Sequence, residues 1–142
     1  EPLPREEEFP AVYRWLAREP SVKALVELPI STDARETRYI YFSTLHWKPL
    51  ANGFSGYFPE SHRRLTETIR ILPDQRGLDL LRDLWISHIV VHAESQIRQR
   101  ALRQWEARFA GREVERVYSS GRISVYRLLG APSSRNPKRA GL

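Results

Sequence analysis

The sequence predicts an α/β fold, in which a small mixed β-sheet is flanked by helices and the chain ends in a β-hairpin. Short runs rich in β-branched residues alternate along the chain with segments whose apolar residues recur at helical spacing. Near the C-terminus, two segments of alternating apolar and polar residues surround a Ser-Gly turn. A length of 142 residues, of which 41% are hydrophobic, is enough for one domain with its own core.

The N-terminal part predicts a linker, a short helix and a strand. Residues 1–9 indicate the linker, because two prolines interrupt regular structure and an acidic run follows them. A helix up to Arg18 is expected from apolar residues on one face, and Pro20 lies just beyond its end. Residues 23–28 have the composition of a strand, which Pro29 terminates.

Two interpretations compete for residues 34–45. Asp33 and Glu36 have the spacing of a capping box, which predicts a helix. The β-branched and aromatic composition of residues 39–44 favours a strand instead. After this segment, residues 52–53 (Asn-Gly) form a dipeptide that is typical of turns.

Two helices and a buried strand are expected next. Residues 60–72 show helical periodicity, and Pro73 terminates it. Asp74 is expected to cap a second helix with an apolar face. Residues 86–92 then form a short, nearly unbroken apolar run, which is typical of a strand covered on both faces. The expected apolar residues of the second helix are Leu78, Leu81, Leu84 and Trp85.

The clearest predicted helix covers residues 94–109, with Gly111 just past its end. Residues 114–119 and 122–129 are then expected to pair as a hairpin. Residues 130–142 are rich in Pro, Ser and basic residues and are expected to form a disordered tail, so the predicted domain covers residues 10–129. The apolar stripe expected on the helix consists of Ile97, Ala101, Trp105 and Phe109.

The order of these elements also predicts how the strands pair. Strands 23–28 and 87–92 are expected to be parallel neighbours, because a long crossover that contains helices joins them. The final hairpin is expected to add antiparallel strands at the edge of the sheet.

Several classes of chemistry have no support in the sequence. No cysteine is present, which excludes disulfides and thiolate metal sites, and no phosphate-binding glycine motif occurs, so no cofactor is expected. His88 and His92 are spaced i, i+4, but on a strand they lie about 13 Å apart, so no metal site is expected. No paired carboxylates suit acid–base catalysis. The domain by itself is therefore not predicted to carry catalytic residues.

The most distinctive part of the chain is residues 39–59, YIYFSTLHWKPLANGFSGYFP, which we call the aromatic segment. Aromatic rings beside small polar groups suit stacking on sugar rings or bases. The alternative is that the rings close the core and the glycines serve only turn geometry. A further candidate is His92, because ligand sites of α/β proteins form at the C-terminal ends of parallel strands. The candidates for binding within the segment are His46, Trp47, Asn52, Gly53, Ser55 and Tyr57.

The aromatic segment resembles the pattern YxyxSTxHWxPLxNGYSGxxP, which is found in the C-terminal region of bacterial polytopic membrane proteins of the GT-C glycosyltransferase type. In those proteins the pattern follows a strand that ends in Leu-Pro, here residues 28–29. A leucine-rich helix and a strand similar to residues 89–92 come later. The three landmarks together span roughly residues 10–129. Phe54 stands where tyrosine is usual.

The resemblance implies a non-catalytic domain on the extracytoplasmic face of the cell membrane. In GT-C proteins the catalytic carboxylate lies in an early loop of the membrane part, so no residue of this chain inherits that role. The domain is expected to assist recognition of an acceptor or glycan, or to brace the membrane part. The expected partners are the protein's own transmembrane region, a glycan or lipid-linked sugar, and the membrane surface. A start at Glu1 rather than methionine predicts a piece of a longer protein.

The net charge of +6 supports an alternative, a stand-alone arginine-rich module that binds nucleic acid or anionic lipid. Of these two partners, nucleic acid is the less favoured. Such binding would be steeply salt-dependent. A small enzyme that uses His46 or His92 is a third interpretation, but the sequence identifies no partner carboxylate for either. The arginines expected to dominate the binding of anions are Arg98, Arg100, Arg103 and Arg108.

Overall fold

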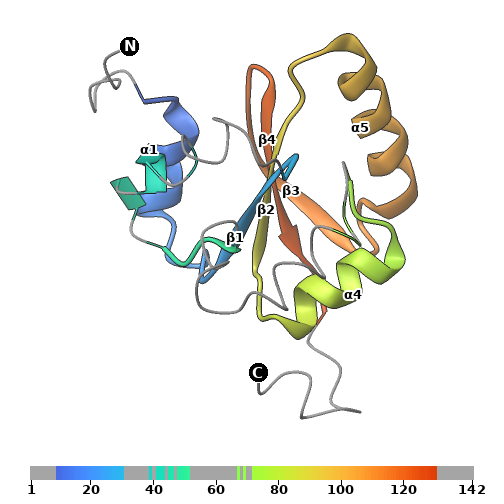
Figure 1. Cartoon of the computed structure of the whole chain (residues 1–142), viewed down its shortest axis with the longest axis horizontal. Helices are drawn as coiled ribbons and strands as arrows, with labels where there is room; N and C mark the ends of the chain where they lie inside the picture. The colour runs from blue at the N-terminus through green and yellow to red at the C-terminus, as the bar shows by residue number, and fades with distance from the viewer. Residues whose placement is uncertain are drawn as a thin grey trace.

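The computed structural model describes residues 9–30, 39, 41–43, 45–46, 48–51, 67, 69 and 72–130. Within these ranges the protein has the predicted α/β fold, with helices on a four-stranded mixed sheet of order β1-β2-β4-β3 (Figure 1). The elements are α1 (Ala11–Arg18), β1 (Leu25–Leu28), α4 (Gln75–Asp83), β2 (His88–His92), α5 (Gln96–Phe109), β3 (Val114–Ser120) and β4 (Ile123–Leu128).

The predicted strand pairing is confirmed, with one difference in the hairpin. β1 and β2 are parallel neighbours, in register from Leu25 opposite His88 to Leu28 opposite Val91. β3 and β4 form the hairpin, which turns through Gly121 at a φ of 60°. Of the two hairpin strands, only β3 lies at an edge of the sheet, because β4 pairs with β2 on its other side. The hairpin therefore extends the sheet from β2, and β1 forms the opposite edge.

Helices cover the two faces of the sheet separately, with α1 on one side and α4 and α5 on the other (Figure 1). Strand alternation divides the buried side chains between these layers. On β1, Val26 and Leu28 belong to the core beneath α4 and α5, whereas Leu25 packs into the core beneath α1. Every residue of β1 and β2 is buried, as expected for strands covered on both faces.

The start of the aromatic segment is helical wherever it is described, namely at residues 39, 41–43 and 45–46. The helical interpretation is therefore confirmed for these residues, and the strand interpretation is wrong for them. Tyr39 and Phe42 are spaced i, i+3 and both enter the core on the α1 side. Phe42 packs edge-on against Phe9, with ring centroids 4.7 Å apart. Packing of this helical face outweighs the local β-propensity.

Several predictions fall on residues that are not described. These are the linker up to residue 8, the cap at residues 33–36, the turn at residues 52–53, the helix over residues 60–72 apart from three positions, and the tail from residue 131. Phe9, the last residue of the predicted linker, is buried against the aromatic rings of residues 41–42.

The capping prediction for α4 is confirmed, but the predicted burial of Trp85 on this helix is wrong. Asp74 Oδ1 accepts a hydrogen bond of 2.9 Å from the Gly77 amide. The helix ends at Asp83, and the amides of Trp85 and Ile86 bond back to the last turn as in a Schellman motif. Trp85 occupies the left-handed position of this motif, with a φ of 62°, and its side chain is 61% exposed.

The helix α5 is confirmed, but its buried face is rotated from the predicted stripe. Leu102, Trp105 and Phe109 face the core, whereas Ile97 is 82% exposed. At 100° per residue, Ile97 lies about 110° around the helix from the centre of this face. Arg98 lies close to the centre of the same face and is half-buried. The first turn of α5 therefore directs an arginine, rather than an isoleucine, toward the body of the domain.

Candidate functional site

A fully buried carboxylate lies beneath α1. Glu27 is 0% exposed, and its Oε1 accepts a hydrogen bond of 2.6 Å from the Tyr13 hydroxyl. The Nε2 atom of His92 lies 2.8 Å from the same oxygen. Burying a carboxylate costs several kcal/mol unless polar partners compensate for the lost water. Partners from α1 and β2 therefore hold this carboxylate at the centre of the domain.

The fold brings these partners together from three elements. Glu27 lies on β1, next to Val90 on the parallel strand β2, and His92 ends β2 two residues later. Residues two apart on a strand point to the same face, so the His92 side chain also lies on the α1 side. We call the set formed by Glu27, His92 and Tyr13 the Glu27 cluster.

The ring of His92 is held in a defined orientation. The Tyr39 ring stacks on it with centroids 4.9 Å apart and an interplanar angle of 21°. The same Glu27 oxygen accepts from the Tyr13 hydroxyl, so the proton between Glu27 and His92 belongs to Nε2. In the neutral imidazole, Nδ1 is then a lone-pair acceptor, and no described residue donates to it. An imidazole oriented by a carboxylate in this way can accept a proton or a hydrogen bond from a hydroxyl.

His46 presents the opposite hydrogen-bonding character. It is only 7% exposed, and its Nδ1 accepts a hydrogen bond of 2.9 Å from the Lys48 amide. The neutral ring therefore carries its proton on Nε2, which is buried without a partner among the described residues. The His46 ring stacks over Tyr13, with centroids 6.4 Å apart and an interplanar angle of 17°. His46 thus adjoins the Glu27 cluster through Tyr13.

A third histidine is buried on the same side of the sheet. His88 is 1% exposed, and its Nδ1 lies 2.8 Å from the Ser87 hydroxyl. Burial lowers the pKa of His88 to about 4, and the positive charge of Arg127 acts in the same direction. Burial likewise lowers the pKa of His46 to about 4, with a further contribution from the charge of Lys48. Both rings are therefore neutral at pH 7.

These shifts predict a loss of stability in mild acid. Both histidines have a pKa near 6.5 when unfolded and about 4 when folded, so the unfolded chain binds more protons in between. Stability is therefore present above pH 6.5 and lost as the pH falls toward 4. Between pH 7 and pH 5 each ring should contribute a loss of about 1–2 kcal/mol. Urea unfolding at the two pH values measures the loss.

The variants His46→Gln and His88→Gln provide the comparison for that experiment. Each should reduce the difference in unfolding free energy between pH 7 and pH 5, because it removes one group that must be protonated. An unchanged difference in both variants would show that neither ring is responsible.

Two of the seven predicted binding residues are described, and the structure brings them together. His46 contacts Tyr13 and His92 contacts Glu27, so both adjoin the same cluster although 46 positions separate them along the chain. The other five predicted binding residues lie outside the described part of the chain: Trp47, Asn52, Gly53, Ser55 and Tyr57.

The described part of the aromatic segment enters the core. Tyr39, Phe42 and Leu50 are all less than 9% exposed. The Leu25 amide donates to the Pro49 carbonyl at 2.9 Å, which fixes residues 48–51 beside β1. The interpretation that the rings close the core is therefore confirmed for Tyr39 and Phe42. The first residue of the segment, Tyr39, therefore packs against the Glu27 cluster through its contact with His92.

Glu27 was missed from the sequence, because no partner carboxylate was identified there for His46 or His92. The signal was available, because Glu27 is the only charged residue in the otherwise apolar strand LVEL. A charge within such a run is buried if helices cover both faces of the strand. Tyr13 carried no such signal, since a tyrosine on an apolar helix face is an ordinary core residue.

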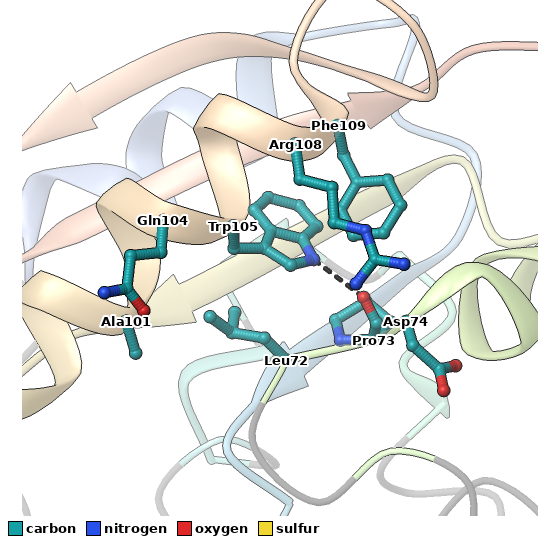
Figure 2. Close-up of a pocket in the computed structure, with 8 residues that line it drawn as sticks. All are labelled: Leu72, Pro73, Asp74, Ala101, Gln104, Trp105, Arg108 and Phe109. Carbon is teal, nitrogen blue, oxygen red and sulfur yellow. Dashed lines mark hydrogen bonds between the residues drawn. The ribbon is translucent and has the colours of Figure 1, made fainter.

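A concavity lies on the other side of the sheet from the Glu27 cluster, between α5 and residues 72–74 (Figure 2). Its volume is ≈ 300 Å³. The Trp105 Nε1 donates to the Pro73 carbonyl at 2.7 Å, which fixes the loop against the helix. The Arg108 guanidinium lies over the Phe109 ring at 5.0 Å. This groove has an apolar floor and one cation at its rim, and its lining is separate from the Glu27 cluster.

Comparisons with family models, curated proteins and solved structures find no match for this chain. Within the described ranges, no group of three or more potential ligand side chains could hold a metal ion. No helix in the same ranges has the length and apolar character needed to cross a membrane.

Proposed function

We propose that this chain is a non-catalytic extracytoplasmic domain of a GT-C-like membrane glycosyltransferase, in which it assists recognition of an acceptor or glycan. The observation that carries the proposal is the pair of histidines beside the Glu27 cluster. Nε2 of His46 is buried without a partner among the described residues, and Nδ1 of His92 accepts from no described residue. Buried polar groups that lack partners are rare and are commonly retained for function.

The two free nitrogens are complementary to a sugar. His46 offers an N–H donor at Nε2, and His92 offers an acceptor at Nδ1. A sugar hydroxyl both donates and accepts hydrogen bonds, so it can satisfy either ring. The aromatic segment adds rings that suit stacking on the apolar face of a sugar. Each hydrogen bond or ring contact contributes about 1 kcal/mol, so the isolated domain should bind glycans weakly.

The proposal assigns the remaining contacts to the parent protein. Its transmembrane region would hold the lipid-linked sugar and carry out the transfer, and this domain would hold the acceptor or brace the membrane part. The groups described around Glu27 bind and orient, so no catalytic residue, metal or cofactor is assigned to them.

A titration of the ¹⁵N-labelled chain with neutral oligosaccharides tests the proposal by NMR. We expect changes in chemical shift at the side chains of Trp47 and His46, with dissociation constants near the millimolar range because few contacts contribute. The variant Trp47→Ala should weaken binding several-fold. Trp85→Ala is the matched control, because Trp85 is exposed and lies outside the proposed site. If no shift changes near Trp47 or if both variants bind alike, the proposal is wrong.

One observation favours the second candidate function, a basic module for anionic lipid or nucleic acid. Arg100, Arg103 and Arg108 are exposed on α5, and none of them forms an ion pair with a described residue. Exposed Ile97 adds an apolar contact on the same helix. This candidate predicts binding to anionic vesicles or oligonucleotides that falls steeply with salt. Binding that is independent of salt would contradict it.

A further inference from the structure

The groove between α5 and residues 72–74 has walls that contacts within the domain hold in place (Figure 2). The Trp105 Nε1 donates to the Pro73 carbonyl at 2.7 Å, which joins the helix to the opposite wall. The Asp74 carboxylate accepts from the Gly77 amide, which ties the same wall to the first turn of α4. The groove is therefore organised in advance, and a ligand would not have to order either wall on binding.

The floor of the groove is apolar, and one small residue keeps it open. Leu72, Trp105 and Phe109 line it, and the two aromatic rings pack against each other with centroids 5.8 Å apart. Ala101 lies about one helical turn before Trp105 and also lines the groove, where a longer side chain would fill the space. The volume of ≈ 300 Å³ is at the lower end of the range for small-molecule sites. The groove therefore has room for one small apolar ring.

A single guanidinium borders this apolar space. Arg108 lines the groove, and its guanidinium lies over the Phe109 ring at 5.0 Å, which leaves its N–H groups to donate. Figure 2 shows the Asp74 carboxylate directed away from this guanidinium. Arg108 forms no ion pair with a described residue. The rim of the groove therefore offers a cation whose hydrogen-bond donors can reach an anion.

The other charges of α5 also favour an anion at this groove. Arg100 and Arg103 are exposed and, like Arg108, form no ion pair with a described residue. The acidic residue of the helix is Glu106, which pairs with Arg116 at 3.5 Å and accepts from the Tyr126 hydroxyl. Its negative charge is therefore offset by partners on the sheet, and the exposed face of α5 is positive.

We propose that this groove binds a small carboxylate that carries an apolar ring. The ring lies on the floor beside Leu72 and Trp105, and both carboxylate oxygens accept from Arg108, whose forked donors match this geometry. One guanidinium at the rim suits a ligand with a single negative charge. The site goes beyond the proposed function and does not depend on it, because Trp105 and Phe109 belong to the core on the opposite side of the sheet from Tyr13.

Three probes test the site by NMR on the ¹⁵N-labelled chain: phenylacetate, its neutral analogue phenylacetamide, and acetate. Phenylacetate should shift the amides of Leu72, Asp74 and the second half of α5. Phenylacetamide lacks the charge-assisted hydrogen bonds and should bind about fivefold more weakly or less. Acetate lacks the ring and should also bind more weakly than phenylacetate. Equal affinity for phenylacetate and phenylacetamide, shifts confined to other parts of the chain, or no binding at all would overturn the proposal.

The variant Arg108→Gln tests the role of the charge. It should remove the preference for phenylacetate over phenylacetamide, because glutamine can donate to either probe but carries no charge. Arg103→Gln is the matched control, since Arg103 is an exposed arginine of the same helix that does not line the groove. It should keep the preference. If the two variants behave alike, Arg108 does not bind the carboxylate.

The variant Ala101→Leu tests the location of the ring. Leucine should fill the groove and weaken the binding of both ring-containing probes. Ala107→Leu is the matched control, because Ala107 is exposed on the same helix and lies outside the groove. Leucine is nearly as favourable as alanine in a helix, and Ala101 is only half-buried, so both variants should fold. If Ala101→Leu binds phenylacetate as tightly as Ala107→Leu does, the groove is not the site.

Discussion

Replacing Glu27 with alanine is expected to lower the free energy of unfolding by about 3–5 kcal/mol. The variant leaves the Tyr13 hydroxyl and Nε2 of His92 without their acceptor in a region where Glu27 is 0% exposed. It also opens a cavity between β1 and α1, which adds to the loss. Urea unfolding monitored by tryptophan fluorescence measures the change.

The conservative variant Glu27→Gln should cost much less, about 1–2 kcal/mol, because its carbonyl oxygen can still accept from Tyr13 or His92. Glu115→Ala is the matched control. Glu115 forms an exposed pair with Arg127 and should change the unfolding free energy by less than about 0.5 kcal/mol. If Glu27→Ala were as mild as Glu115→Ala, Glu27 would not be the buried centre of a hydrogen-bonded cluster.

Replacing Arg82 with methionine is expected to destabilise the fold by about 3–4 kcal/mol. The Arg82 side chain is 9% exposed and joins α4 to the ends of β3 and β4. Its Nε donates to the Leu129 carbonyl at 2.7 Å, and its Nη2 donates to the Glu113 carbonyl at 3.1 Å and carboxylate at 2.9 Å. Methionine fills much of the volume but leaves these half-buried acceptors without their donor.

Lysine should not rescue this position, because a single ammonium cannot reproduce the forked geometry of the guanidinium. Hydrogen exchange should show faster exchange at the C-terminal end of β4 in both variants. Arg76→Ala, which alters an exposed arginine of the same helix, should change stability by less than about 0.5 kcal/mol. If the β4 amides of Arg82→Met exchanged at the wild-type rate, Arg82 would not hold α4 against the ends of β3 and β4.

The elements that the sequence predicted well are those that local chemistry determines. Asp74 caps α4, and Gly121 turns the hairpin at positive φ, because each residue suits its backbone position whatever surrounds it. The parallel pairing of β1 with β2 also follows from chain order and the handedness of crossovers.

The features that the sequence did not reveal depend on contacts between distant segments. The rotation of α5 placed Arg98 rather than Ile97 toward the body of the domain, and periodicity alone cannot distinguish two overlapping faces of a short helix. The partner of His92 is Glu27, which lies 65 positions earlier in the chain. A lone glutamate in a strand indicates burial only once the helices that cover it are known.

The sequence indicated His46 and His92 as candidates, and the structure adds the hydrogen bonding of their rings. The C-terminal end of a parallel strand indicated His92, and the aromatic segment indicated His46. Their opposite characters, acceptor at Nδ1 of His92 and donor at Nε2 of His46, follow from Glu27 and from the Lys48 amide. Neither character could be deduced from residue type alone, because the tautomer of a histidine is set by its neighbours.

The most direct measurement is a two-bond ¹H–¹⁵N correlation spectrum of the imidazole nitrogens at pH 7.5, recorded without ligand and with a neutral oligosaccharide that binds. The account predicts that His46 is neutral with its proton on Nε2, and that the Nε2 resonance moves when the oligosaccharide binds. A proton on Nδ1 of His46 in the free protein, or an Nε2 resonance that stays fixed at saturation, would contradict it.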